Sequence, residues 1–106
     1  MGDKERLLVV EDDPQISRQL KWAFTDEYEV HLAQDAHSAL EVLNRKRPPV
    51  LTLDLGLPPK PHDSQVGMDL LGKILQLEPG CKVVVVTGND EHENALQAIS
   101  HGAWDY

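Results

Sequence analysis

The pattern of hydrophobic and polar positions changes its period repeatedly along the chain. Three short runs, residues 7–10, 50–53 and 83–86, are apolar or β-branched at every position, which is typical of strands covered on both faces in a parallel sheet. A fourth segment, residues 29–33, alternates between polar and apolar positions and indicates an edge strand. Four further stretches have the spacing of amphipathic helices. Their apolar faces are formed by Ile16, Leu20, Ala23 and Phe24; by Ala36, Ala39, Leu40 and Leu43; by Leu70, Leu71, Ile74 and Leu75; and by Ala95, Leu96 and Ile99.

The resulting order β-α-β-α-β-α-β-α predicts an α/β domain built on a doubly wound parallel sheet. The boundary residues agree with this order. Asp13 followed by Pro14 suits the start of a helix, whereas Pro79-Gly80 and Gly102 suit the ends of two others. Because ligands of such sheets bind beyond the carboxyl ends of the strands, functional residues are expected in the loops after the three buried strands, at residues 7–10, 50–53 and 83–86.

Those three loops carry acidic and hydroxyl side chains. They hold Glu11, Asp12 and Asp13 after residues 7–10, Asp54 after residues 50–53, and Thr87 with Gly88 after residues 83–86. Each residue alone has an ordinary structural explanation, because acidic residues often cap helices. Carboxylates gathered at one rim of a sheet would repel each other, however, unless a cation lay among them. A hard cation such as Mg²⁺ suits this donor set, and beside it the Asp54 carboxylate could capture a phosphoryl group, with the Thr87 hydroxyl stabilising the charge on the transferring oxygens.

Composition narrows the classes of function. A chain of 106 residues that is 41% hydrophobic has the size of one small globular domain. Its 18 acidic and 10 basic residues give a net charge of -8, which disfavours direct nucleic-acid binding. Cys81 is the only cysteine and is expected to be a small buried residue in a reducing compartment. No apolar stretch suits a membrane helix or a signal peptide, so the sequence predicts a cytoplasmic protein without membrane attachment.

Four short motifs follow one another over nearly the whole chain. They are Leu7-Leu8-Val9-Val10-Glu11-Asp12-Asp13, Leu53-Asp54-Leu55-Gly56-Leu57-Pro58, Val85-Val86-Thr87-Gly88 and Gly102-Ala103-Trp104-Asp105-Tyr106. In this order they resemble the receiver domains of response regulators from bacterial two-component systems. The last motif, with the long loop after residue 58, is similar to receivers of activators that work with the alternative sigma factor. The resemblance implies a flavodoxin-like sheet with strand order 2-1-3-4-5 and one receiver domain over residues 1–106.

The resemblance also implies a role for each matching residue. Asp54 would accept a phosphoryl group from a sensor histidine kinase, Thr87 would be the switch hydroxyl, and Tyr106 would be the switch aromatic. The implied Mg²⁺ ligands are Glu11, Asp12, Asp54 and the carbonyl of Gly56. The two switch residues would move together, and the changed surface would control an output domain that lies C-terminal to this segment and regulates transcription. The domain itself would be no enzyme beyond phosphorylating itself from small donors and losing the phosphoryl group again.

Two departures from the receiver pattern bear on these expectations. The loop from Pro58 to Gly67 is longer than the usual turn, and we expect it to be an exposed insertion in which His62 and Asp63 are solvated rather than bound to a metal. The chain also stops at Tyr106, so the fifth strand with its lysine is expected to be incomplete and the fifth helix that receivers carry to be absent. We therefore expect a receiver truncated at its C-terminal end, in which phosphorylation is in doubt and exposed apolar surface favours a homodimer.

Three other functions remain open. A pseudo-receiver would bind partners without phosphorylation, although intact Glu11, Asp12, Asp54 and Thr87 argue against it. An aspartate-nucleophile phosphatase or phosphotransferase would place an Asp-x-Asp pattern after the first strand, where this chain has three contiguous acids. A flavin-binding protein would need a loop rich in serine, threonine or glycine at the same place, and the acids present there would repel a phosphate.

Overall fold

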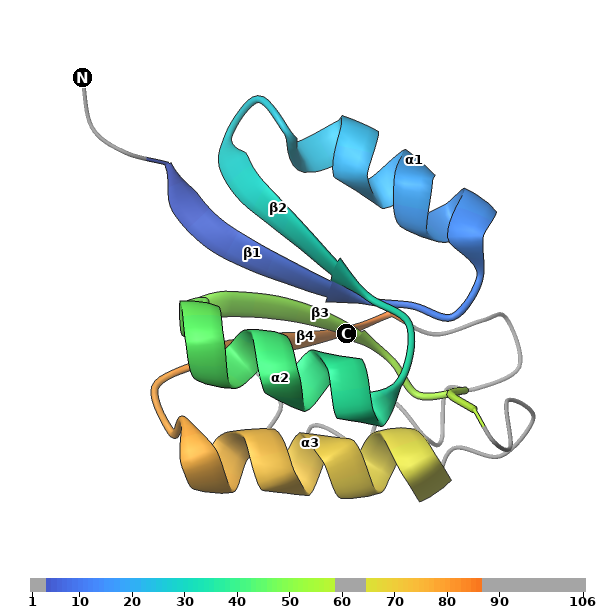
Figure 1. Ribbon diagram of the computed structural model, residues 1–106, viewed down its shortest axis with the longest axis vertical. Helices are drawn as coiled ribbons and strands as arrows, with labels where there is room; N and C mark the ends of the chain where they lie inside the picture. The colour runs from blue at the N-terminus through green and yellow to red at the C-terminus, as the bar shows by residue number, and fades with distance from the viewer. Residues whose placement is uncertain (1–3, 59–64, 87–106) are drawn as a thin grey trace.

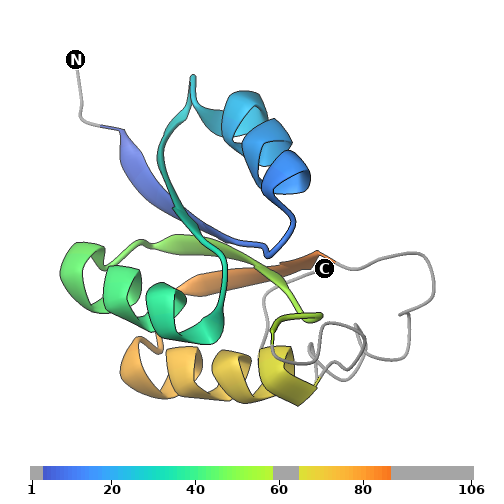
Figure 2. The same cartoon turned by 45° about the vertical axis from the view of Figure 1, so that its right-hand side comes forward.

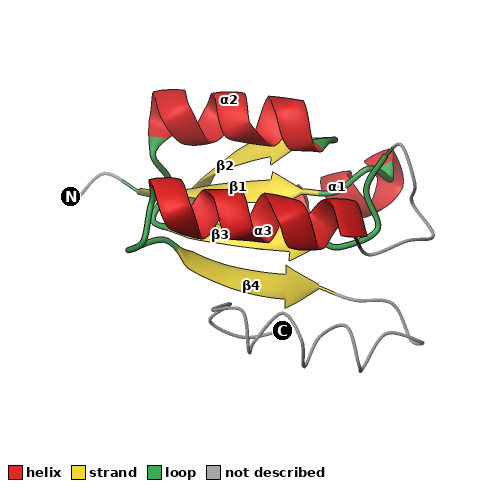
Figure 3. Ribbon diagram, turned by 90° about the horizontal axis from the view of Figure 1, so that it is seen from below, coloured by secondary structure: helices red, strands yellow, loops and turns green. Residues whose placement is uncertain are grey.

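Four parallel strands form the sheet at the centre of the molecule. The computed structural model describes residues 4–58 and 65–86. The strands are β1 (Glu5–Val10), β2 (Tyr28–Ala33), β3 (Val50–Asp54) and β4 (Lys82–Val86), hydrogen-bonded in the order β2-β1-β3-β4 (Figure 3). This order confirms the predicted fold class for the first four strands. The fifth strand and the fourth helical pattern lie outside the described residues.

Helices cover both faces of this sheet. Helix α1 (Pro14–Phe24) packs on one face, against β1 and β2, while α2 (Ala36–Lys46) and α3 (Gln65–Leu77) pack side by side on the other (Figures 1 and 2). Each crossover therefore runs from the carboxyl end of one strand through a helix to the amino end of the next. The doubly wound arrangement expected from the alternating pattern is confirmed.

The hydrophobic core lies mainly between the sheet and the pair α2 and α3. Alternate positions of β1, β3 and β4 point to this side, and they meet the apolar faces of the two helices. The core is made of Leu8, Val10, Ala33, Ala39, Val42, Leu43, Leu51, Leu53, Leu55, Leu57, Leu70, Leu71, Ile74, Cys81, Val83 and Val85. Cys81 is buried as predicted, and burial raises the pKa of its thiol to about 11. Because burial of apolar area drives folding, this layer holds the loops at the carboxyl end of the sheet in place.

Side-chain caps fix the starts of the first two helices. Asp13 precedes Pro14 as predicted, and its Oδ1 accepts a hydrogen bond of 2.9 Å from the backbone N–H of Gln15. At the start of α2, Asp35 Oδ1 accepts a bond of 2.8 Å from the N–H of Ser38, whose hydroxyl in turn accepts from the N–H of Asp35. Both caps lie at the ends of the short loops that follow β1 and β2, so they set the direction in which the chain leaves the sheet.

Candidate functional site

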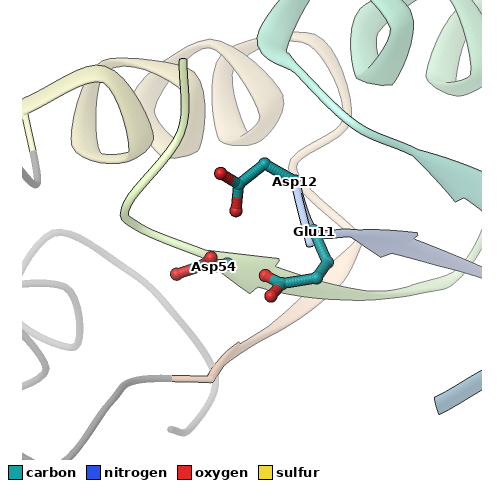
Figure 4. A group of neighbouring side chains, drawn as sticks. All are labelled: Glu11, Asp12 and Asp54. Atoms are coloured by element: carbon teal, nitrogen blue, oxygen red, sulfur yellow. The ribbon is translucent and has the colours of Figure 1, made fainter. Parts of the chain in front are cut away.

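Three carboxylates meet at the carboxyl end of the two central strands. Glu11 and Asp12 directly follow β1, and Asp54 is the last residue of β3. The two strands pair in parallel with Val10 opposite Leu53, so the residues that follow emerge side by side. One oxygen from each carboxylate lies within 4.8 Å of the others, and Figure 4 shows the three groups pointing toward one another. The predicted meeting of acidic residues from separate strand ends is present in the structure.

These acids lie close together with little solvent to separate their charges. Glu11 is buried with 7% of its surface exposed, and Asp12 and Asp54 are half-buried. None of the ion pairs formed among the described residues involves any of the three. Burial raises the pKa of Glu11 well above its usual range, and the hydrogen bond and negative charge of Asp54 raise it further. Burial and the charge of Asp54 also raise the pKa of Asp12. The cluster is thus electrostatically unfavourable until positive charge enters it.

The loop after β3 orients the Asp54 side chain. The backbone N–H of Gly56 donates a hydrogen bond of 3.0 Å to Asp54 Oδ1. One residue further, the N–H of Leu57 donates a bond of 3.1 Å to the carbonyl oxygen of Leu55, which closes a tight turn. The side chains of Leu55 and Leu57 are fully buried and anchor this turn in the core. Gly56, predicted as a metal ligand through its carbonyl, therefore lies beside the carboxylate cluster.

The described residues cover only some of the predicted site residues. Asp13 stands next to the cluster in sequence, and its side chain caps α1, as predicted. Thr87, Gly88 and Tyr106 lie outside the described residues, as do His62 and Asp63 of the long loop, and their roles stay predictions. Two features at this end of the sheet were missed by sequence reasoning. One is the cap that Asp35 forms, for which the Asp-x-x-Ser spacing was a signal, and the other is the close approach of Gly67 to the loop after β3.

The donor set fits a hard divalent cation. Carboxylate oxygens are the ligands that Mg²⁺ and Ca²⁺ prefer, and the three groups that converge here supply only oxygens. The raised pKa values of Glu11 and Asp12 support the same conclusion, because burial and neighbouring negative charge raise them and a bound cation would offset both the loss of water and the repulsion. The residues present therefore match Mg²⁺ in both chemistry and charge.

Comparison with known proteins identifies the family. Residues 7–106 match the family model of the response regulator receiver domain. The chain belongs to the response regulator receiver family. Among curated relatives, the receiver is 35% identical over 101 residues to the nitrogen assimilation regulatory protein NtrX of Azorhizobium caulinodans. It is 31% identical over 106 residues to the probable transcriptional regulatory protein TcrX of Mycobacterium tuberculosis. These alignments cover 94% and 99% of this chain but only 22% and 43% of the relatives' own lengths.

Solved receiver structures share the fold. The receiver domain of NtrX from Brucella abortus superposes with a TM-score of 0.84 at 35% identity, and the alignment covers 93% of this chain and 81% of that one. A response regulator protein from Burkholderia pseudomallei, described with a phosphorylated aspartic acid, a calcium ion and citrate, superposes with a TM-score of 0.83 at 26% identity. That alignment covers 97% of this chain and 58% of the other. The family and fold predictions are confirmed. Within the described ranges, no helix has the length and hydropathy needed to cross a membrane.

Proposed function

We propose that this receiver is a phosphoacceptor switch in which Asp54 takes a phosphoryl group from a sensor histidine kinase. The observation that carries the proposal is the convergence of Glu11, Asp12 and Asp54 within 4.8 Å at the ends of two adjacent strands. Three acids in such a position cost stability, because each loses water and faces negative charge. A binding site for a cation and a phosphoryl group explains why they would be kept there.

The chemical step needs a nucleophile held in a fixed orientation. An oxygen of the Asp54 carboxylate attacks the phosphorus atom of a phosphohistidine and forms a new O–P bond. The N–P bond to the imidazole breaks, and its electron pair returns to the ring nitrogen, which then takes up a proton from solvent. The hydrogen bond from Gly56 to Asp54 Oδ1 restricts rotation of the carboxylate, so that the reacting oxygen is presented in one direction.

Mg²⁺ is the cofactor that we propose for this site. The ligands would be the carboxylates of Glu11, Asp12 and Asp54 together with the Gly56 carbonyl. When bound, the ion would neutralise negative charge on the carboxylates and on the phosphoryl oxygens. Glu11, with its raised pKa, would release any proton that it holds when the cation binds. The calcium ion of the Burkholderia pseudomallei relative supports a divalent cation in this family of structures.

The output of the switch is proposed from the relatives. The Thr87 hydroxyl and the Tyr106 ring would change position together after phosphorylation, and the altered surface would control an output domain C-terminal to this segment. NtrX is a regulatory protein and TcrX a probable transcriptional regulatory protein by name, which favours control of transcription over a classical enzymatic activity. The cytoplasm is the location that we propose for this receiver. The chain covers 22% of NtrX and 43% of TcrX, so the output domain is itself part of the proposal, as are the resemblance to sigma-factor-dependent activators and the formation of a homodimer.

Intact mass after exposure to a small phosphodonor tests this function. The protein is incubated with acetyl phosphate and Mg²⁺, and we expect the mass of one added phosphoryl group. Asp54→Asn should abolish the addition, because the amide is not a nucleophile of this kind. Asp13→Asn is the matched control: it removes an adjacent negative charge yet retains a side-chain oxygen that can cap α1, so phosphorylation should persist.

The possible outcomes separate the remaining functions. No added mass in a protein that still binds Mg²⁺ would contradict the phosphoacceptor and favour the pseudo-receiver. Turnover of many donor molecules per chain would favour an aspartate-nucleophile phosphatase or phosphotransferase. Addition that survives Asp54→Asn would assign the phosphoryl group to another residue.

A further inference from the structure

Gly67 stands in the first turn of α3 at a point where no side chain fits. It is buried, and a Cβ atom built on it would lie 2.4 Å from both the Cα and the carbonyl oxygen of Leu55 and 2.7 Å from its carbonyl carbon. Real Cβ atoms essentially never approach other heavy atoms within 3.0 Å. The atoms in question belong to the backbone, so no side-chain rotation can relieve the overlap. The first turn of α3 therefore packs its backbone directly against the loop after β3, and Figures 1 and 2 show the amino end of the helix next to that loop.

The peptide group that Gly67 touches is the one that orients Asp54. The carbonyl carbon and oxygen of Leu55 belong to the same planar peptide unit as the N–H of Gly56. That N–H donates the 3.0 Å hydrogen bond to Asp54 Oδ1. Because the unit is rigid, a shift of its carbonyl side moves its N–H by a similar amount. The Leu55 carbonyl also accepts the bond from Leu57, so the turn has little freedom to absorb such a shift.

We propose that Gly67 is a positioning residue for the phosphoacceptor site: the absence of its side chain lets α3 hold the Leu55–Gly56 peptide where its N–H orients Asp54. The inference rests on the proposed function, because it concerns the same carboxylate. It adds that the geometry of the metal site depends on a contact made by the amino-terminal turn of a helix. A contact that served packing alone would affect stability without affecting the site.

Gly72 supplies a matched control within the same helix. A Cβ at this position would meet nothing within 4 Å. Gly72→Ala should raise the melting temperature, because alanine is a better helix former than glycine, and should leave Mg²⁺ affinity unchanged. Gly67→Ala makes the same chemical change at the close contact. We expect it to weaken Mg²⁺ binding roughly tenfold or more, as is typical when the groups that orient metal ligands are disturbed.

The experiment combines both substitutions and reads the site in two ways. Mg²⁺ affinity is measured by titration without any phosphodonor, and the Gly56 amide is followed by NMR in the metal-free protein. In the Gly67→Ala/Gly72→Ala variant, the alanine at position 72 should restore part of the lost stability. The metal affinity should stay low and the Gly56 amide should stay shifted toward its position in Asp54→Ala, where its acceptor is missing.

Each outcome decides the inference. Unchanged Mg²⁺ affinity and an unmoved Gly56 amide in Gly67→Ala would overturn it, as would recovery of both together with stability in the double variant. A double variant that does not fold would make the contact a requirement of the fold, which also overturns the assignment to the site. If the unmodified protein bound no Mg²⁺, the proposed function would fail, whereas the Gly56 amide would still test the positioning role of Gly67.

Discussion

Charged side chains are arranged in opposite ways at the two ends of the sheet. At the amino end, Arg6 Nε lies 3.2 Å from Glu29 Oε2, and the same oxygen lies 2.6 Å from His31 Nε2. Arg6 also donates through Nη1 to the carbonyl oxygen of Lys46 at 3.0 Å, the end of α2. At the carboxyl end, Glu11, Asp12 and Asp54 face one another without a basic partner among the described residues. Unlike charges pair at one end, and like charges gather at the other.

Solvent explains why this difference matters for function. The Arg6 and Glu29 side chains are 46% and 50% exposed, so water screens their attraction and the pair adds little to stability. Glu11 is 7% exposed, so the repulsion it experiences is screened much less. The hydrogen bonds from His31 and Arg6 lower the pKa of Glu29, whereas burial and neighbouring acids raise that of Glu11. A fold under selection for stability alone would not retain the second arrangement.

Neutralising one acid at each end of the sheet should give the largest difference in stability and in the response of stability to Mg²⁺. Asp12→Asn removes one repelled charge, and we expect the metal-free protein to become more stable by about 1 to 2 kcal/mol. The same change removes a proposed ligand, so the stabilisation that Mg²⁺ gives to the unmodified protein by mass action should largely disappear. Urea unfolding with and without Mg²⁺ measures both effects.

Glu29→Gln is the corresponding change at the amino end. It removes an exposed acid that already has partners, so we expect a much smaller change in stability than for Asp12→Asn, in the direction of a loss, and an unaltered response to Mg²⁺. Equal responses of the two variants to Mg²⁺ would contradict the assignment of the cation to the carboxyl end.

The sequence predicted the carboxyl end better than the contacts that support it. Changes in the period of hydrophobic and polar positions located the strands in the sequence, and their parallel order then required residues 11 and 54 to emerge side by side. The expected limits of β1 and β2 were short by one or two residues, because polar Glu5, Arg6 and Tyr28 extend the pairing without fitting an apolar run. Hydrogen bonding of the backbone to a neighbouring strand leaves no trace in such a pattern.

Close approaches between backbones were beyond what the sequence could show. Glycine is disfavoured in helices, and Gly67 was assigned to the end of a loop. It nevertheless lies inside α3. Contact with Leu55, a residue distant in sequence, is the reason that only glycine fits there. A tertiary contact of this kind overrides local preference, and a single sequence does not report it.

Asp35 is an acid at the carboxyl end of the sheet that has hydrogen-bond donors, so it can be compared with the unpaired acids of the cluster. Asp35 also follows a strand, but hydrogen bonds from the backbone and hydroxyl of Ser38 lower its pKa. Asp35→Ala should cost about 1 kcal/mol of stability, whereas Asp35→Asn should cost less because it can still cap the helix. Because the folded pKa is the lower one, this stabilisation is present above the ordinary pKa of aspartate and is lost as pH falls through the lowered value.

Unfolding measured from neutral to acidic pH tests both the size and the sign of that effect. The difference between the unmodified protein and Asp35→Ala should shrink as pH falls. An Asp35→Ala variant that is more stable than the unmodified protein at neutral pH, with an advantage that disappears in acid, would mean that Asp35 resembles the repelled acids of the cluster rather than a capped one. Asp12→Asn should show that pattern, since burial and Asp54 raise the pKa of Asp12.

The smallest expected effect belongs to the exposed pair at the amino end. Arg6→Gln removes the ion pair with Glu29 and the bond to the Lys46 carbonyl, and we expect a loss of about 0.2 to 1 kcal/mol at low salt. Lys73→Gln, which removes an equal charge from an exposed position of α3, is the control. At 1 M salt the Debye length falls to about 3 Å, so the part of the loss due to the ion pair should largely vanish while the helix cap of Asp35 keeps its effect. A loss at Arg6 that persisted unchanged in high salt would show that the backbone bond to α2, rather than the charge pair, holds the amino end together.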